Sequence, residues 1–187
     1  MKILSKFILT KCLGWKIMEP IAPDKKCVIL GAPHTSMMDF LVSWLYYDAI
    51  GGDAYVLMKK ELFKGPLKPI LKAMGGIPVD RKKSAILVKD VIKAFNSKES
   101  MQLAIAPEGT RKRTTKWKAG FYVIAKAAKV PVYLGYFDWG KKEVGRGERI
   151  ELTDDARADL KRIRQWYKDK GIVGKHPEMF TTGDDLK

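Results

Sequence analysis

Two side chains five positions apart, His34 and Asp39, are the pair in this sequence best suited to acid–base chemistry. The apolar run at 27–30 predicts a buried strand, and the Gly-Ala-Pro stretch at 31–33 ends it. An apolar helical pattern follows over 40–50. We therefore expect His34 in the turn between a strand end and a helix start. In open α/β sheets, such turns border the crevice where ligands bind.

The spacing of the pair restricts how the two side chains can meet. Five residues of helix turn through about 500°, so the two positions do not share a helix face. They meet only if His34 precedes the helix and Asp39 lies in its first turn. Asp39 would then stay ionised near the helix N-terminus, fix the imidazole tautomer and leave the other nitrogen as a general base. Alternatively, Ser36 and Asp39 form a capping box and His34 only hydrogen-bonds a carbonyl. From this stretch alone both interpretations stay open.

A second turn, Pro-Glu-Gly-Thr-Arg at 107–111, directly follows a predicted strand at 102–106. Gly109 allows backbone N–H groups to approach a ligand closely. Arg111 can bind a phosphate or carboxylate through two parallel hydrogen bonds. Glu108 could hold such an arginine or accept a hydrogen bond from a substrate hydroxyl. Taken alone, this turn is slightly better explained as a surface turn with an ion pair.

The elements needed to position these turns alternate between strand and helix. Besides 27–31, strands are expected at 54–58, 77–79, 102–106, 131–137 and, less regularly, 144–152; helices are expected at 36–50, in part of 59–73, from Ser84, at 117–129 and from 153–155 to about 170. This alternation predicts an α/β fold with a largely parallel or mixed sheet flanked by helices. His34, Arg81 and Glu108 would then all lie at the carboxyl edge of that sheet.

We expect an N-terminal helix at 1–18, one α/β domain at 19–170 and a weakly patterned tail at 171–187. The helix is amphipathic and basic, with apolar residues at Ile3, Leu4, Phe7, Ile8 and Trp15 on one broad face. Such a helix could lie in a membrane interface or pack on the domain through the same face. Its interspersed lysines exclude a membrane span or a signal-peptide core.

The 36 Lys and Arg residues outnumber the 21 Asp and Glu residues, which gives a formal net charge of +15. This excess indicates an anionic partner, such as a membrane surface, a phosphorylated substrate or a nucleic acid. The two cysteines, Cys12 and Cys27, have no metal-binding or redox spacing and suggest a reducing compartment.

Three blocks in a fixed order resemble the glycerophospholipid (lysophospholipid) acyltransferase family, which includes bacterial 1-acylglycerol-3-phosphate acyltransferases. They are HTSMMD at 34–39, KKELFKGPLKPILKAMGGIPVDR at 59–81 and APEGTR at 106–111, with a weaker fourth block, VPVYLGY, at 130–136. The third block begins with Ala106 and continues with Lys112 where the family usually has Phe and Ser. The chain therefore looks like a compact subgroup of this family.

The resemblance implies transfer of a fatty acyl group from acyl-CoA or acyl carrier protein to the hydroxyl of a lysophosphatidate-like acceptor. His34 would be the general base and Asp39 its partner, with no covalent intermediate. Arg81 and Arg111 would bind the acceptor phosphate, and Glu108, Gly109 and Thr110 would shape that pocket. No metal or cofactor is expected. The implied partners are the acyl donor thioester, the lysophospholipid, an anionic membrane surface and acyl carrier protein. The implied location is cytoplasmic, peripheral on the inner face of the cell membrane.

Competing functions fit the sequence less well. The acceptor could be another lysolipid or an aminolipid, in which case Arg81 would matter little. A basic nucleic-acid-binding domain would explain the charge, but it would not need the His34–Asp39 pair, and no nucleic-acid module is recognisable. Intact His34, Asp39 and Glu108 argue against a non-catalytic lipid-binding relative.

Overall fold

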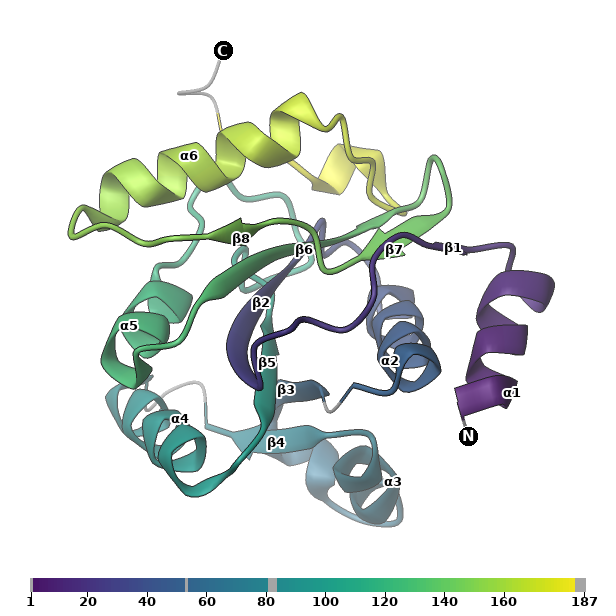
Figure 1. Cartoon of the computed structure of the whole chain (residues 1–187), viewed down its shortest axis with the longest axis horizontal. Coiled ribbons are helices and arrows are strands. Elements are labelled where there is room, and N and C mark those ends of the chain that lie inside the picture. Colours follow the sequence, from purple (N-terminus) through teal and green to yellow (C-terminus); the bar gives the residue numbers. More distant parts are fainter. Residues whose placement is uncertain (1, 53, 81–83, 184–187) are drawn as a thin grey trace.

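The computed structural model describes residues 2–52, 54–80 and 84–183. Within these ranges eight strands form one sheet in the order β1-β7-β6-β2-β5-β3-β4, with β8 also paired to β6 (Figure 1). The strands are β1 (Lys16–Ile17), β2 (Lys26–Ala32), β3 (Ala54–Lys59), β4 (Gly76–Val79), β5 (Met101–Ile105), β6 (Val132–Asp138), β7 (Glu143–Gly145) and β8 (Arg149–Ile150). Strands β2 to β6 pair in parallel, whereas β7 and β8 run antiparallel to β6. The predicted α/β class with a mixed, largely parallel sheet is confirmed.

Helices cover both sides of this sheet. They are α1 (Lys2–Phe7), α2 (Met38–Ile50), α3 (Leu67–Ala73), α4 (Ser84–Ser97), α5 (Gly120–Ala128) and α6 (Ala156–Asp169), with the shorter turns η1 (Ile8–Cys12), η2 (Lys60–Phe63) and η3 (Pro177–Met179). Figure 1 shows α1, α2 and α3 on one side of the sheet and α4 and α5 on the other. Right-handed crossovers explain this, because the steps from β2 to β3 and from β3 to β4 run in one direction and the later steps run back.

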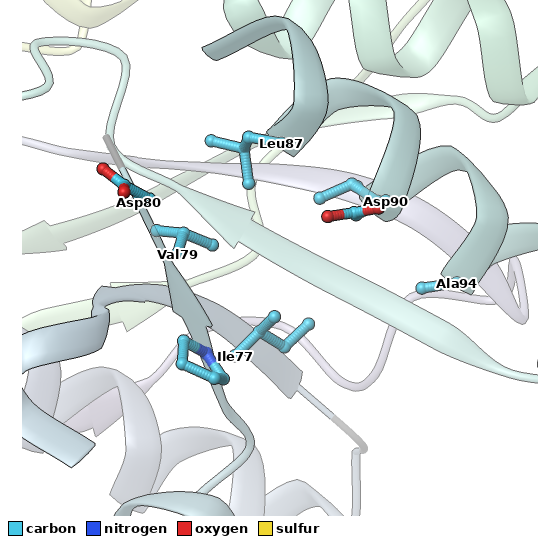
Figure 2. Close-up of a pocket in the computed structure, with 8 residues that line it drawn as sticks. Ile77, Val79, Asp80, Leu87, Asp90 and Ala94 are labelled. Carbon is cyan, nitrogen blue, oxygen red and sulfur yellow. The ribbon is translucent and has the colours of Figure 1, made fainter. Parts of the chain in front are cut away.

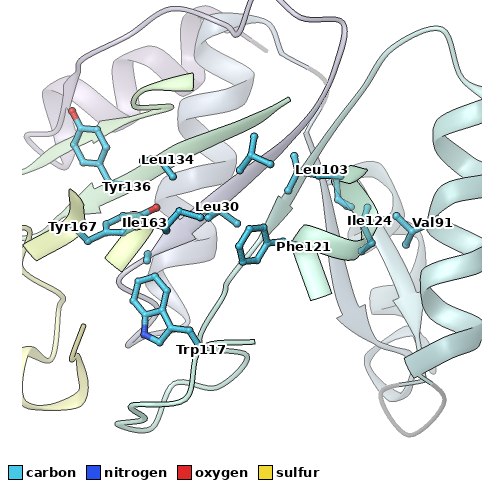
Figure 3. Packing of buried hydrophobic residues seen from close by; sticks show 14 of the residues in the cluster. Leu30, Val91, Leu103, Trp117, Phe121, Ile124, Leu134, Tyr136, Ile163 and Tyr167 are labelled. Atoms are coloured by element: carbon cyan, nitrogen blue, oxygen red, sulfur yellow. The ribbon is translucent and has the colours of Figure 1, made fainter. Parts of the chain in front are cut away.

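Side chains on successive residues of β2 enter two separate cores. Val28 and Leu30 are fully buried in the larger core with Phe121 of α5 and Tyr167 of α6 (Figure 3). Cys27 and Ile29 point to the opposite face of the sheet and join the smaller core under α2. A strand that is buried on both faces reads as a continuous apolar run, as 27–30 does.

The N-terminal helix is shorter than predicted, and its packing face is different. Helical structure ends at Cys12 rather than at residue 18, and 16–17 form β1. Gly14 has a φ of +71°, a left-handed conformation that turns the chain away from the helix axis. Leu9 and Trp15 are buried against α2 and the end of β6, whereas Ile3 and Phe7 are 87% and 56% exposed.

The other elements follow the prediction closely. The segment 59–73 divides into η2 and α3 around Gly65 and Pro66, as its prolines indicated. The expected helix 117–129 begins only at Gly120, since Trp117 is buried in the larger core. Asp155 caps α6 by accepting hydrogen bonds from the N–H groups of Arg157 and Ala158. None of the helices in the described ranges is both long and apolar enough to cross a bilayer.

Candidate active site

His34 and Asp39 meet at the carboxyl edge of the sheet, where His34 lies in the turn after β2 and Asp39 in the first turn of α2. The His34 Nδ1 atom lies 3.4 Å from the Asp39 Oδ2 atom. The His34 side chain is 27% exposed, whereas that of Asp39 is 1% exposed. Asp39 therefore approaches the imidazole from the protein interior. No side chain or backbone group in the described ranges hydrogen-bonds Nε2, so that nitrogen is available to a substrate.

Asp39 also organises the backbone around it. Its Oδ2 atom accepts hydrogen bonds from the N–H groups of Thr35 (2.8 Å) and Ser36 (2.7 Å). The Ser36 hydroxyl oxygen accepts a hydrogen bond from the Met38 N–H in return, at 3.2 Å. This is close to a capping box at the start of α2. The capping role and the pairing with His34 are thus compatible, because one oxygen of Asp39 serves both.

Glu108 joins this site from the second turn, which follows β5. Its Oε1 atom accepts a hydrogen bond from the backbone N–H of His34 at 2.9 Å. The side chain is 5% exposed, and its Oε2 atom is buried with no hydrogen-bond partner among the described residues. Burial raises the pKa of the Glu108 carboxyl from 4.5 to about 7, although the His34 N–H opposes this change. Glu108 therefore fixes the loop that carries His34.

The remaining residues of the second turn extend outward from Glu108. Gly109 has a φ of +64° and lies where an added Cβ atom would meet the Lys118 side chain at 2.9 Å. The Thr110 hydroxyl oxygen accepts a hydrogen bond from the Lys112 N–H at 3.1 Å. Arg111 is exposed, and no ion pair to it is found within the described ranges. Its guanidinium can therefore bind a dissolved anion without first breaking a protein contact.

The other predicted arginine, Arg81, lies outside the described residues. Its neighbour Asp80 directly follows β4 and contacts Lys60 of η2, with 2.6 Å between Oδ2 and Nζ. A pocket of about 130 Å³ lies beside Asp80, between β4 and α4 (Figure 2). Most of its lining is apolar and comes from Ile77, Pro78, Val79, Leu87, Val91 and Ala94, with Asp80 and Asp90 as the acidic members. None of its lining residues belongs to the two turns that carry His34 and Glu108.

Trp139 is a site residue that sequence reasoning missed. It follows β6, the neighbour of β2 in the sheet, and its Nε1 atom donates a hydrogen bond to the Asp39 Oδ1 atom at 2.9 Å. The Trp15 ring lies edge-on to it, with 5.0 Å between ring centroids. The Nζ atoms of Lys142 and Lys175 lie over the Trp139 ring at 5.2 and 5.0 Å from its centroid. A position directly after a parallel strand at this edge was the only sequence signal for it.

The segment 171–183, which we call the C-terminal strap, links the loops of the site. The backbone N–H of Trp139 donates to the Val173 carbonyl at 2.9 Å. The backbone N–H of His176 donates to the Thr35 hydroxyl oxygen at 3.2 Å. Further along, the Trp117 indole N–H donates to the Thr181 carbonyl at 3.2 Å. The strap thus touches the ends of β6 and β2 and the loop after β5. The weak pattern of this stretch gave no indication of such contacts.

The described residues include no cluster of three or more His, Cys, Asp or Glu side chains that could hold a metal ion. The site instead brings together the His34 imidazole, the Asp39 carboxylate beside it and the buried Glu108 carboxyl. The exposed Arg111 and Lys112 follow in the same turn as Glu108. This set can remove a proton from a hydroxyl group and attract an anion.

Comparisons with known proteins identify a family and a solved structure of similar fold. The model of the family described as Acyltransferase matches residues 16–134, which is more than half of the chain. The crystal structure of the 1-acyl-sn-glycerophosphate (LPA) acyltransferase PlsC from Thermotoga maritima superposes with a TM-score of 0.62 at 18% identity, covering 90% of this chain and 76% of that one. That likeness establishes the fold. Among curated proteins, no significant match is found. The family match confirms the resemblance carried by the motifs: the chain belongs to the acyltransferase family and is an acyltransferase.

Proposed function

We propose that the protein transfers a fatty acyl group from a thioester of coenzyme A or acyl carrier protein to the hydroxyl of a lysophosphatidate-like acceptor. The observation that carries this proposal is the His34–Asp39 pair, with 3.4 Å between Nδ1 and Oδ2 and with a partly exposed His34 side chain. The solved structure of similar fold is named as a 1-acyl-sn-glycerophosphate acyltransferase, which supports the same acceptor class.

In the proposed reaction, His34 Nε2 removes the proton of the acceptor hydroxyl as its oxygen attacks the thioester carbonyl carbon. The tetrahedral intermediate then collapses, the carbon–sulfur bond breaks, and the proton passes from His34 to the leaving thiolate. The products are an ester and a free thiol. Asp39 keeps Nδ1 protonated and stabilises the imidazolium that forms. The reaction needs no metal or cofactor, because the thioester already carries the activated acyl group.

Hydrogen bonds to the carboxyl groups of Glu108 and Asp39 limit which backbone groups can stabilise the negative oxygen of the intermediate. The backbone N–H groups of His34, Thr35 and Ser36 are occupied by the carboxyl groups of Glu108 and Asp39. They serve to hold the loop, so the oxyanion must be bound by other donors at this edge. We propose that Arg111, which is exposed, binds the acceptor phosphate together with Arg81, and that Gly109 and Thr110 shape the turn that leads to Arg111.

The test is thiol release from palmitoyl-CoA, with and without lysophosphatidate, by wild type, His34→Ala and His176→Ala. We expect release to require the acceptor and to fall by roughly 10²–10⁴ in His34→Ala. The second histidine is the matched control, because its side chain is half exposed and only its backbone contacts Thr35. Acceptor-dependent release by His34→Ala at the wild-type rate would contradict the mechanism.

The acceptor is tested with monoacylglycerol, which has the same hydroxyl but no phosphate, and with Arg111→Ala. We expect Arg111→Ala to raise the KM for lysophosphatidate and to leave the rate with monoacylglycerol unchanged. Equal rates for both acceptors in the wild type would point to a lysolipid or aminolipid acceptor without a phosphate. If coenzyme A thioesters give no release, the same panel with acylated carrier protein identifies the donor.

We further propose that the enzyme works at the cytoplasmic face of the cell membrane and binds it peripherally through α1. Ile3, Leu4 and Phe7 are 87%, 60% and 56% exposed, with Lys2 and Lys6 next to them in the sequence. Deleting α1 together with η1 would open the smaller core, because Leu9 of η1 is fully buried there. Substitution of Phe7 by Glu is therefore the cleaner test, with binding to anionic vesicles as the readout. Unchanged binding would remove α1 from the proposal.

A further inference from the structure

The segment from η2 to α3 exposes more apolar side chains than a water-facing surface requires. Leu62, Leu67 and Ile70 are 46%, 55% and 55% exposed and lie within nine residues of one another. Leu67 and Ile70 are three positions apart and so share one face of α3. In α3 no residue is buried. Single exposed apolar residues are ordinary, but a local cluster of this kind marks a contact surface.

One side chain anchors this segment to the domain. Phe63 is 8% exposed, and its ring lies near Gly76 of β4, where an added Cβ atom would meet it at 3.0 Å. The same absent Cβ would lie 2.7 Å from the Leu71 carbonyl oxygen. These contacts place the inner side of α3 over β4 and leave Leu67 and Ile70 directed outward.

Lysines surround the apolar cluster. The stretch 59–73 contains five lysines, at 59, 60, 64, 68 and 72, and a single acidic residue, Glu61. All five lysine side chains are exposed. Lys60 is paired with Asp80, which leaves the others to interact with an external anion. Apolar side chains flanked by lysine stems and ammonium groups match the interface of a bilayer that contains anionic lipids.

We infer that the η2–α3 segment is a second membrane-contact element, whose apolar side chains enter the interface of an anionic bilayer while its lysines bind the lipid headgroups. This inference deepens the proposed function and rests on it for the presence of a membrane substrate. Its position supports it: α3 lies on the same side of the sheet as α1 and α2, so both exposed clusters belong to one side of the molecule (Figure 1). The η2 turn begins where β3 ends, at the sheet edge that carries His34.

The experiment compares substitutions on opposite sides of the sheet. Ile70→Glu is paired with Val123→Glu, since Val123 on α5 is 50% exposed and Ile70 is 55% exposed. Partitioning of the full-length protein onto phosphatidylglycerol–phosphatidylcholine vesicles is measured by flotation. We expect Ile70→Glu to weaken it by about tenfold and Val123→Glu to leave it nearly unchanged. Equal partitioning of the two variants overturns the inference.

A second pair tests the role of charge. Lys68→Glu/Lys72→Glu is compared with Lys161→Glu/Lys168→Glu, which makes the same charge change on exposed positions of α6. The first pair is expected to weaken binding to anionic vesicles by about tenfold more than the second. Both double variants should bind vesicles of phosphatidylcholine alone equally weakly. Identical losses for the two pairs would show that net charge, and not this surface, controls binding.

Two further measurements separate the possible failures. Thiol release with a short-chain, monomeric acceptor reports the chemistry without a membrane, and it should be the same in Ile70→Glu and wild type. If wild type releases no thiol but α3-dependent vesicle binding persists, the proposed reaction fails and this inference stands. If wild type reacts but Ile70→Glu binds vesicles normally, the inference fails alone. Dissociation of a dimer by Ile70→Glu, with unchanged vesicle binding, would assign the surface to a second copy of the chain.

Discussion

Trp139 holds the oxygen of Asp39 that does not face His34. The indole N–H bonds Oδ1 at 2.9 Å while Oδ2 faces the imidazole. Replacing Trp139 with Phe keeps an aromatic ring but removes this donor. A hydrogen bond to a charged group contributes about 1.5–3 kcal/mol, so we expect kcat to fall roughly tenfold or more. The KM for the acyl donor should change little, because in the proposed mechanism the lost hydrogen bond orients Asp39 and does not bind substrate.

Trp15→Phe is the control for that substitution. Trp15 packs edge-on against Trp139 and is more deeply buried than Trp139, but its side chain makes no hydrogen bond to Asp39. Loss of packing alone should therefore lower the thermal stability of both variants and lower kcat only in Trp139→Phe. If kcat falls equally in the two, Trp139 acts through packing and not through its N–H group.

The buried carboxyl of Glu108 makes stability depend on pH. Burial raises its pKa to about 7 in the folded protein, from 4.5 when it is exposed. Between these values the folded state keeps a proton that the unfolded chain has released. The free energy of unfolding therefore decreases as pH rises through this window, by an amount of order 3 kcal/mol at most. Glu108→Gln keeps an oxygen to accept from the His34 N–H and cannot ionise, so it should lack this decrease.

The measurement is denaturant unfolding of wild type and Glu108→Gln from about pH 5 to pH 8. The variant should gain stability relative to wild type as pH rises. Glu99→Gln is the control variant, because it removes one carboxylate at an exposed position. Parallel pH profiles for wild type and Glu108→Gln would show that Glu108 is not protonated preferentially in the folded state.

The residues of the site differ in how readily the sequence reveals them. His34 and Asp39 are five positions apart, and one turn before a helix is enough to bring them together. Glu108 lies 74 positions from His34, yet a parallel sheet places both turns at one edge, so topology indicated their proximity. Trp139 lies 100 positions from Asp39, and nothing in its neighbourhood distinguishes a tryptophan that donates a hydrogen bond from one that fills a core.

At the scale of elements, the C-terminal strap supports the loop that carries His34. Gly174 lies where an added Cβ atom would be 2.8 Å from the Thr35 Cγ2 atom and 3.2 Å from the Pro33 Cβ atom. Gly174→Ala should push the strap away and weaken the bond between the His176 N–H and Thr35. We expect lower activity and a stability loss of about 1–3 kcal/mol, measured by kcat and thermal unfolding.

Gly120→Ala serves as the comparison for that variant. Gly120 starts α5, and an added Cβ atom there would meet nothing within 4 Å. Alanine also has a higher helix propensity than glycine, so this substitution should leave activity unchanged and leave stability equal or slightly higher. Full activity in a destabilised Gly174→Ala would show that the strap contributes to folding but not to the geometry of the site.

The element prediction failed where tertiary contacts override local pattern. Apolar spacing correctly located the elements of the core, because β2 to β6 and their helices bury the residues that form the pattern. At the N-terminus the same spacing predicted one helix with one packing face. The structure instead buries Leu9 and Trp15 and leaves Ile3 and Phe7 exposed, since the chain turns at Gly14 to reach β1. Periodicity reports apolar residues but not which surface covers them.

At the scale of the whole molecule, the net charge of +15 and the exposed apolar clusters are both consistent with the proposed contact with an anionic bilayer. The clusters of α1 and α3 lie on the same side of the sheet as α2, whose first turn carries Asp39. The helices of the other side contribute instead to the larger core. An enzyme that takes a lipid acceptor from a bilayer would need this asymmetry, because only one side faces the membrane.

This arrangement predicts how substitutions in the two clusters combine. If α1 and α3 enter the same bilayer at once, each contact adds its own free energy, so the fold-losses of Phe7→Glu and Ile70→Glu should multiply in the double variant. Flotation of wild type, both single variants and the double variant with phosphatidylglycerol-containing vesicles measures this. If the clusters were alternative contacts, each single substitution would change binding by less than about twofold, because the intact cluster would still bind, and only the double variant would lose it. The ratio of the double-variant loss to the product of the single losses therefore decides whether the protein binds the membrane with one face or with either of two.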